Sequence, residues 1–236
     1  FIGGSFDSFT MCWNEMSESI LRTRHSARSF LQDKPVDEKL IREIVEEAGL
    51  APSWCNSQPW KAFVLTGDAA KKMVETHTQN NVSGAKAWCE VVPPELTPEH
   101  WKPEHWQNMQ KFWAAGDVME GRENRLGFLE ACAADFHAPA IVYITIPKSS
   151  TFYQAYDAGA FGYGICLAAH ERGLSCIPAY EFIRFPQEIR AVLDIPEDEL
   201  LFMGIGIGYA DDAELNSLYK TNGRVPVDEI LTIKSK

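Results

Sequence analysis

The sequence has 236 residues, of which 45% are hydrophobic, and a formal net charge of −11 at pH 7. This charge argues against an extended surface for nucleic acid or for an anionic membrane, because both partners require clustered lysine and arginine. No run of about 18 apolar residues occurs, so we expect no membrane-spanning helix. The length suits one hydrophobic core, and we expect residues 1–236 to form a single domain.

The six cysteines include no C-x-x-C pair and are not densely spaced. This pattern predicts neither a zinc site nor a disulfide framework, and it favours a reducing compartment such as the cytoplasm. His100 and His105 are five residues apart, which does not place two metal ligands on one helical face. We therefore expect no metal.

Three regular elements are predicted before residue 80. Apolar residues recur at helical spacing over residues 37–49, with Asp37 as N-cap and Gly49 as a stop signal. Residues 60–65 are predicted to form a strand. Residues 68–78 are predicted to form a helix with an acidic residue at its positive end.

Residues 80–127 differ in composition from the rest of the chain. They contain most of the tryptophans and a near repeat, Pro98-Glu99-His100-Trp101 followed by Pro103-Glu104-His105-Trp106. We interpret this stretch as an insertion over the core, partly helical. It could serve as a lid or pocket wall, or equally as extra packing at a subunit interface.

The second half of the chain predicts a buried strand at 140–146, because that run is almost continuously β-branched. The helix predicted at 154–172 is apolar nearly all round and rich in small residues, which favours burial against a second subunit. Strands are expected at 174–177 and 200–207, with a short helix at 186–193 between them and an extended arm at 209–236. The fold class is α+β, with a mixed central sheet flanked by helices.

The alternating glycines of Gly204-Ile205-Gly206-Ile207-Gly208 superficially suggest a nucleotide loop. They lie inside a strand pattern, however, and no helix follows them as a dinucleotide fingerprint requires. We expect these glycines to let a neighbouring element pack closely against the strand.

The densest polar signal is the stretch from Arg22 to Phe30, which holds three arginines within seven residues. Guanidinium groups beside a serine hydroxyl suit phosphate oxygens, so the cluster is a candidate anion site. The alternative is a solvated helix end, and the cluster alone does not decide between the two.

A second polar segment, residues 51–60, joins a predicted helix to a predicted strand. Asn56 and Gln58 carry both donors and acceptors and could read the polar edge of a flavin, while two prolines fix the loop. The alternative is a turn whose amides bind their own backbone.

Together the two segments resemble the nitroreductase family. The resemblance rests on Arg24-His25-Ser26-Ala27-Arg28-Ser29-Phe30 and, about one helix later, on Pro52-Ser53-Trp54-Cys55-Asn56-Ser57-Gln58-Pro59-Trp60. It extends to Asp157-Ala158-Gly159-Ala160 and to Asn222-Gly223-Arg224-Val225-Pro226, so that only residues 80–127 lie outside it. It implies a nitroreductase-like fold in an intertwined homodimer with an extended C-terminal arm.

The resemblance also implies bound FMN, reduced by NADH or NADPH, with the FMN sites at the subunit interface. Arg24, His25, Ser26 and Arg28 would hold its phosphate and ribityl chain together with Asn222 and Arg224. The partner subunit would contribute Pro52, Ser53, Asn56 and Gln58. One face of the flavin would lie against Pro178, Ala179 and Tyr180, where many relatives carry a Glu-Gly pair; Asn222 likewise stands where a lysine is frequent.

The implied activity is a ping-pong transfer of reducing equivalents from NAD(P)H to a small aromatic acceptor such as a nitroaromatic or a quinone, with the chemistry carried by FMN and no catalytic side chain. Our hypothesis for acceptor stacking involves five aromatic residues of the insertion: Trp88, Trp101, Trp106, Phe112 and Trp113. Two alternatives stay open. One is a reductive dehalogenase or ene reductase on the same fold, and the other is a flavin-binding protein without reductase turnover.

Overall fold

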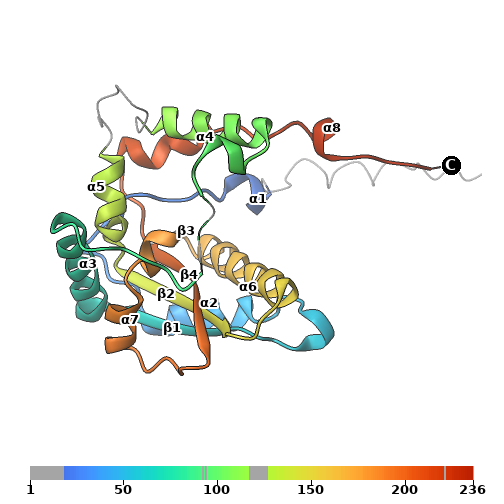
Figure 1. Cartoon of the computed structure of the whole chain (residues 1–236). Helices are drawn as coiled ribbons and strands as arrows, with labels where there is room; N and C mark the ends of the chain where they lie inside the picture. Colours follow the sequence, from blue (N-terminus) through green and yellow to red (C-terminus); the bar gives the residue numbers. More distant parts are fainter. Residues whose placement is uncertain (1–18, 92, 94, 117–126, 221, 236) are drawn as a thin grey trace, which may run out of the picture.

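The computed structural model describes residues 19–91, 93, 95–116, 127–220 and 222–235. At its centre is a four-stranded sheet in the order β1-β2-β4-β3 (Figure 1). The strands are β1 (Lys61–Thr66), β2 (Ala140–Pro147), β3 (Ser175–Ala179) and β4 (Glu199–Gly208). All four strands predicted from the sequence are therefore present, within two residues at each end.

The sheet corrects one detail of the α+β prediction, because its three strand pairings are all antiparallel. Among the described residues, parallel pairing is limited to an isolated bridge between Ser26 and Cys176. The apolar run of β2 did indicate burial on both faces, and β2 is buried along seven of its eight residues. Burial on both faces follows from helices covering the sheet and does not fix strand direction.

The helices are α1 (Ile20–Thr23), α2 (Glu38–Ala48), α3 (Gly67–Val82), α4 (Pro103–Ala115), α5 (Phe128–Ala133), α6 (Phe152–Glu171), α7 (Pro186–Val192) and α8 (Val227–Ile230). Short 3₁₀ turns are η1 (Trp54–Asn56), η2 (Pro98–His100), η3 (Asp135–His137), η4 (Tyr180–Ile183) and η5 (Glu214–Lys220). The four helices predicted outside the insertion are confirmed as α2, α3, α6 and α7. Asp37 caps α2 as expected, its carboxylate accepting from the Lys39 amide at 2.7 Å. Among the described residues, no helix combines the length and the apolar character needed to cross a membrane.

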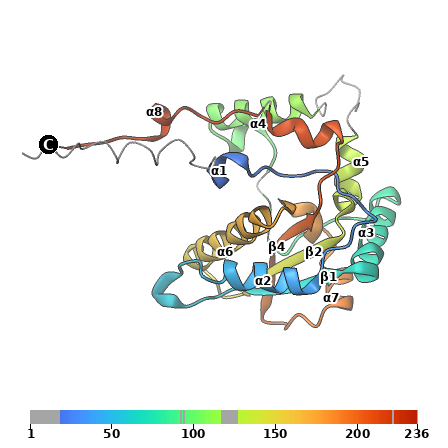
Figure 2. The ribbon, with the colours of Figure 1, turned by 180° about the vertical axis from the view of Figure 1, so that it is seen from behind.

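Each face of the sheet carries its own core. Val142 and Ile144 of β2 pack with α2 and α6, while Ile141 and Tyr143 pack with α3, α7 and η4 on the other face (Figures 1 and 2). Each such side chain, when fully buried, stabilises the fold by about 1.5–3 kcal/mol. Successive side chains of β2 point to opposite faces of the sheet, so the sheet lies between two helical layers.

The small residues of α6 serve two different faces. A Cβ on Gly164 would lie 3.2 Å from Ala48 Cα, so this glycine lets α6 pack closely on α2 of the same chain. Gly159, by contrast, has open space around it, and the side chains of Tyr153 and Tyr156 are exposed. The face of α6 that carries Tyr153, Tyr156 and Gly159 is therefore the one available for the subunit contact that the sequence favours.

The glycines of β4 are packed against η4, as their spacing predicted. A Cβ on Gly204 or Gly206 would collide with the ring or Cβ of Phe182, which is fully buried. At Gly206 the separation from Phe182 Cζ would be 2.6 Å. These positions therefore require glycine for close approach and not for phosphate binding.

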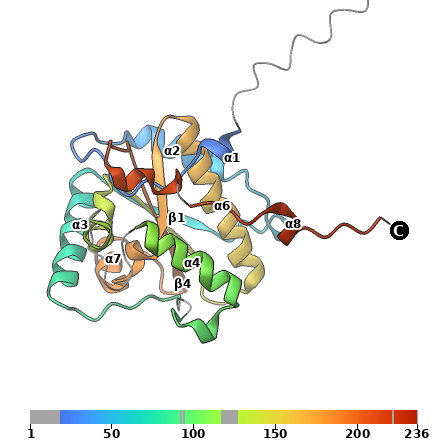
Figure 3. The ribbon, with the colours of Figure 1, turned by 90° about the horizontal axis from the view of Figure 1, so that it is seen from above.

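The tail predicted as an extended arm over 209–236 is partly helical, which is a correction. Residues 214–220 form η5, in which Leu215 and Leu218 are buried three positions apart. Two apolar residues were too few to reveal helical periodicity in the sequence. Beyond η5 the chain leaves the body and includes the short exposed helix α8 (Figures 1 to 3).

Candidate functional site

Residues 24–30, which we call the strap, are an extended segment fixed to the edge of the sheet. Ser26 bridges Cys176 of β3, and the Ala27 amide donates to the Cys176 carbonyl at 3.2 Å. Phe30 bridges Ala210 just after β4. Residues 24–28 are thereby held against the edge strand β3. Their contact at Cys176 lies just before Pro178 and Ala179 of the same strand.

Arg24 presents a donor without an acceptor. Its guanidinium lies 5.5 Å from the ring centre of Tyr163 on α6, and its buried Nε has no hydrogen-bond partner in the described structure. Nearby, the Thr23 hydroxyl and His170 Nε2 are 2.9 Å apart. Burial, followed by the positive fields of His25 and Arg24, lowers the pKa of His170. The surroundings of Arg24 are cationic, and a buried donor that has no partner among the described residues fits an anionic ligand.

Arg28 is a half-buried cation of the strap that lies near two aromatic rings. Its Nη1 donates to the Ser26 carbonyl at 3.1 Å, and its guanidinium lies 5.3 Å from the Phe112 ring and 6.0 Å from the Phe128 ring. Burial lowers the pKa of Arg28, although an arginine stays protonated at neutral pH. The two rings offset part of the desolvation cost through cation–π attraction.

Asn216 of η5 positions this strap and was missed in the sequence. Its Oδ1 accepts from the amides of Arg28 at 2.6 Å and Ser29 at 3.1 Å, and its Nδ2 donates to the Ser29 carbonyl at 2.8 Å. Asp211 adds an acceptor for the Ser29 hydroxyl at 2.5 Å. A single asparagine in a tail without periodicity carries no signal that could have identified this role.

Tyr180 and Glu181 follow Pro178 and Ala179 at the end of β3. The Tyr180 side chain is 43% exposed, and the Arg184 guanidinium lies 5.7 Å from its ring centre. Glu181 lies 3.7 Å from Arg184 Nη1, yet burial outweighs that cation and raises the pKa of Glu181 to about 7. The exposed side of this turn is thus an apolar and phenolic surface next to the arginine strap.

The 52–58 loop lies at the far end of α6. The Trp54 amide donates to Asp157 Oδ2 at 3.0 Å, and the Gln58 amide donates to the Ser53 hydroxyl at 3.0 Å. Asn56 and Gln58 are exposed, and both have positive φ. Gln58 Nε2 reaches the Asn56 carbonyl at 3.4 Å, so the loop satisfies part of its own backbone while its strained conformation keeps these amides outward.

The two motifs do not converge within one chain. Trp54 contacts Asp157, whereas Thr23 contacts His170, thirteen residues further along the same helix, or about 20 Å at 1.5 Å per residue. Figure 1 shows the loop before β1 and helix α1 at opposite ends of α6. Pro52, Ser53, Asn56 and Gln58 thus lie apart from Arg24, His25, Ser26 and Arg28.

The C-terminal residues of the predicted site also lie apart from the strap. Arg224 is exposed and makes only local contacts in the described structure, its Nη1 donating to the carbonyls of Asn222 at 3.2 Å and Gly223 at 3.1 Å. The Asn222 amide donates to the Leu218 carbonyl at 3.2 Å. Both residues stand where the arm leaves the body.

Of the five aromatic residues assigned to the acceptor, the structure brings one to the strap. Phe112 of α4 stacks near Arg28. Trp106 and Trp113 pack edge-on against each other along α4, with ring centres 5.4 Å apart. Trp101 donates to the Glu95 carbonyl at 2.8 Å, and Trp88 lies against α7.

Comparison with known proteins gives one family. The model of the nitroreductase family matches residues 21–209. The 4-nitrobenzoate reductase of Pseudomonas putida is 30% identical over 85% of this chain and 88% of its own length. The 4-nitrobenzoate reductase of Nocardioides sp. (strain LMS-CY) is 28% identical over 92% of this chain and 90% of its own length.

Solved structures agree with the sequence match. The FMN and NADPH-dependent nitroreductase NfnB from Sphigopyxis sp. strain HMH superposes with a TM-score of 0.77 at 26% identity, over 92% of this chain and 98% of that one. NfnB from Mycobacterium smegmatis, solved in complex with NADPH, has the same fold, with a TM-score of 0.79 at 24% identity over 91% of this chain and 96% of that one. Since the family model covers both motifs and the whole sheet, the chain belongs to the nitroreductase family.

Proposed function

We propose that this chain is an FMN-dependent reductase that passes reducing equivalents from NADPH to a small nitroaromatic acceptor. The oxidoreductase class and the FMN cofactor follow from family membership, and NADPH is the donor named for the two NfnB structures. The observation that best supports the proposal is the strap itself, in which the buried Arg24 Nε has no acceptor among the described residues and lies beside an exposed turn at the end of β3.

The residues of the strap fit the cofactor's anionic end. Arg24, His25, Ser26 and Arg28 would bind the phosphate and ribityl chain, with Arg224 as a further cation. Pro178, Ala179 and Tyr180 would support one face of the ring system. FMN, when bound, supplies the hydride and electron transfer, so these residues bind and orient and no side chain need act as a base.

We further propose that two subunits form each site. The 52–58 loop is too far along α6 from the strap of its own chain to share a ligand closely with it. Beside this loop, Phe152, Tyr153 and Tyr156 of α6 expose large apolar areas, and the three line an apolar cavity of about 510 Å³ with Pro52 and Trp54. A second copy would cover this surface and bring the loop to the partner's strap.

The C-terminal arm would hold the same dimer together. Its apolar residues Val227, Ile230, Leu231 and Ile233 are exposed in the single chain. A groove of about 920 Å³ runs between α2 and the unpaired edge of β1, lined in part by Ile41, Val45, Ala62 and Val64. An unpaired strand edge accepts an added strand, so we propose that each arm packs into the groove of its partner.

The acceptor would bind beneath α4, which carries the Phe112 ring over Arg28. Residues 80–127 would then be a lid inserted into a single domain, and Phe112 is its residue in contact with the strap. Relatives that reduce 4-nitrobenzoate favour a nitroaromatic acceptor. Preferential turnover of a halogenated phenol or an activated alkene would instead select a dehalogenase or an ene reductase on this fold.

Anaerobic visible spectroscopy of the purified protein tests the proposal. We expect a bound-flavin spectrum that NADPH bleaches and 4-nitrobenzoate then restores, with parallel lines in double-reciprocal plots as ping-pong exchange requires. A flavin that NADPH does not bleach would leave a flavin-binding protein without reductase turnover. The location consistent with this chemistry and with the cysteine pattern is the cytoplasm.

A further inference from the structure

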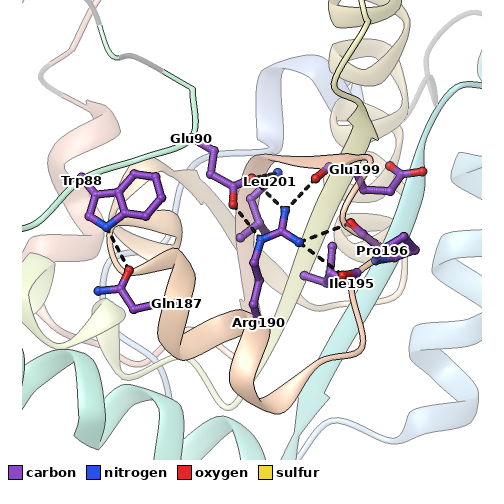
Figure 4. A network of polar contacts seen from close by, with 8 residues as sticks. All are labelled: Trp88, Glu90, Gln187, Arg190, Ile195, Pro196, Glu199 and Leu201. Carbon is purple, nitrogen blue, oxygen red and sulfur yellow. Dashed lines mark hydrogen bonds and ion pairs between the residues drawn. The ribbon is translucent and has the colours of Figure 1, made fainter.

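The first part of the insertion is attached to the body through α7 and the turn before it. The Trp88 amide donates to the Arg184 carbonyl at 3.0 Å. The Trp88 indole Nε1 donates to Gln187 Oε1 at 2.9 Å, as Figure 4 shows. Two residues later, Glu90 reaches into the body on the same side of α7.

Glu90 and Arg190 form a bidentate ion pair. Arg190 Nε donates to Glu90 Oε1 at 2.7 Å and Nη2 to Oε2 at 3.0 Å, and the Leu201 amide also donates to Oε2 at 2.8 Å (Figure 4). Burial opposes ionisation of Glu90, but the hydrogen bonds from Arg190 and Leu201 lower its pKa below the usual value. The carboxylate is thus charged and only 11% exposed.

Arg190 extends this pair to the start of β4. Its remaining N–H groups donate to the carbonyls of Glu199 at 2.6 Å, Ile195 at 3.2 Å and Pro196 at 3.3 Å. One guanidinium therefore joins the insertion, the end of α7 and the first residues of β4. A bidentate, fully used guanidinium is among the more rigid anchors available to a protein.

Beyond Glu90, the polar contacts of residues 95–111 with other described residues lie within the insertion. We define the lid as the described residues 95–116, which include η2 and α4. The hydrogen bonds, ion pairs and ring contacts that 95–111 make with described residues stay within the lid, such as Trp101 to Glu95 and Trp106 to Trp113. No residue of α4 before Gly116 is buried. The next recorded contact with the body is Phe112 on Arg28.

We propose that Glu90, held by Arg190, is a positioning residue that fixes the hinge of the lid and thereby sets the affinity for the acceptor. This inference rests on the proposed function and deepens it. The hydrogen bonds of Glu90 within the described structure go to Arg190 and Leu201, neither of which is assigned to the cofactor, so the step in which NADPH is oxidised should not depend on Glu90. Loss of the pair lets the lid swing about Phe112 and weakens acceptor binding.

The decisive variant is Glu90→Gln, which keeps the shape and removes the charge. We expect the KM for 4-nitrobenzoate to rise about tenfold while kcat and the rate of flavin bleaching by NADPH stay unchanged. Lys61→Met is the matched control, because it removes the neighbouring ion pair with Glu199 at 2.5 Å without touching the insertion. An equal rise in KM for both variants, or none for Glu90→Gln, would overturn the proposal.

Hydrogen exchange provides a readout that needs no activity. Amides of residues 103–115 should exchange about tenfold faster in Glu90→Gln than in the wild type or Lys61→Met, while those of β2 stay protected in all three. Unchanged exchange in α4 would refute the hinge even if the wild type proved to be no nitroreductase. If Glu90→Gln fails to fold, Trp88→Phe removes the bond to Gln187 alone and should show a smaller effect of the same sign; no effect would count against the proposal.

Discussion

Arg24 shows how one side chain can be prepared for a ligand. Its Nε is buried and has no acceptor in the part of the chain that the structure describes, and leaving such a donor unpaired costs about 1–3 kcal/mol, more when the group is charged. The strap keeps it in place through the Ser26 bridge to β3. A phosphate that accepts a hydrogen bond from this donor would offset the cost, which is why this position fits an anion.

Replacing Arg24 should therefore release FMN. A hydrogen bond to a charged group contributes about 1.5–3 kcal/mol, so Arg24→Ala or Arg28→Ala should weaken FMN binding by about 10- to 100-fold. Titration of apoprotein with FMN, followed by flavin fluorescence, measures the change. Arg22→Ala is the control, because Arg22 is exposed on α1 and carries the same charge. Equal losses in Arg22→Ala and Arg24→Ala would contradict the assignment.

Glu181 predicts a pH dependence of stability. Burial raises its pKa to about 7, so the carboxyl is protonated in the fold at pH values where the unfolded chain ionises it. Its contribution is fully present below pH of about 4.5 and is lost as pH rises through about 7, amounting to at most about 3 kcal/mol. Glu181→Gln should remove this loss.

Urea unfolding at pH 5 and pH 8 measures the effect. The free energy of unfolding of Glu181→Gln should gain on that of the wild type as pH increases, whereas the exposed control Glu75→Gln should follow the wild type. Parallel pH profiles for the wild type and Glu181→Gln would show that Glu181 titrates normally.

Sequence reasoning located the strap by composition, since three arginines in an acidic chain are conspicuous. It could not locate Asn216, because the importance of this residue lies in its contacts with a segment far away in the sequence. Asn216 binds Arg28 across 188 positions. Residue spacing predicts which side chains share a face of one helix or strand, and it does not predict contacts between residues so far apart in the sequence.

At the scale of elements, β4 and η4 pack closely because β4 carries glycine where it meets η4. Gly204 and Gly206 of β4 face Phe182, and a methyl group on Gly206 would lie 2.6 Å from Phe182 Cζ and 2.9 Å from Ala138 Cβ. Overpacking of this kind usually costs 1–3 kcal/mol. The turn that η4 forms is the one that presents Tyr180, so this packing also fixes one wall of the site.

Gly206→Ala should therefore lower the free energy of unfolding by about 2 kcal/mol. Because Phe182→Leu removes the colliding Cζ, the cost of Gly206→Ala should be smaller in that background. A double-mutant cycle with urea unfolding measures this coupling. Strict additivity would mean that Phe182 does not restrict Gly206.

Amphipathic periodicity and caps were sufficient to predict α2, α3, α6 and α7, since each has a clear apolar face or an apolar length. They failed for η5, where the buried apolar residues among those described are Leu215 and Leu218. Strand direction was equally out of reach, because burial on both faces gave the same apolar run for an antiparallel sheet. Tertiary pairing decides both.

At the scale of the whole molecule, the single chain leaves too much apolar surface exposed. The arm and the start of α6 together expose Val227, Ile230, Leu231, Phe152 and Tyr156. The arm projects from the body in each view (Figures 1 to 3). Exposed patches of this kind usually mark an interface.

Removing residues 225–236 should convert the protein to a monomer and abolish FMN retention, because the arm would no longer hold the partner's loop at the strap. Sedimentation velocity and the flavin-to-protein absorbance ratio measure the two effects. The point variant Lys234→Ala should remain dimeric and yellow. A truncated chain that is still a dimer with full flavin would assign the interface to other surfaces.

The most direct measurement of a site shared between subunits is complementation between two inactive chains. One chain carries Arg24→Ala and Arg28→Ala, and the other carries Asn56→Ala and Gln58→Ala, so each homodimer lacks half of every site. Co-expressed chains that mix randomly should recover about a quarter of the wild-type FMN sites and of the NADPH-dependent 4-nitrobenzoate reduction, because half of the dimers then hold one intact site. No recovery in dimers shown to contain both chains would contradict a site built from two subunits.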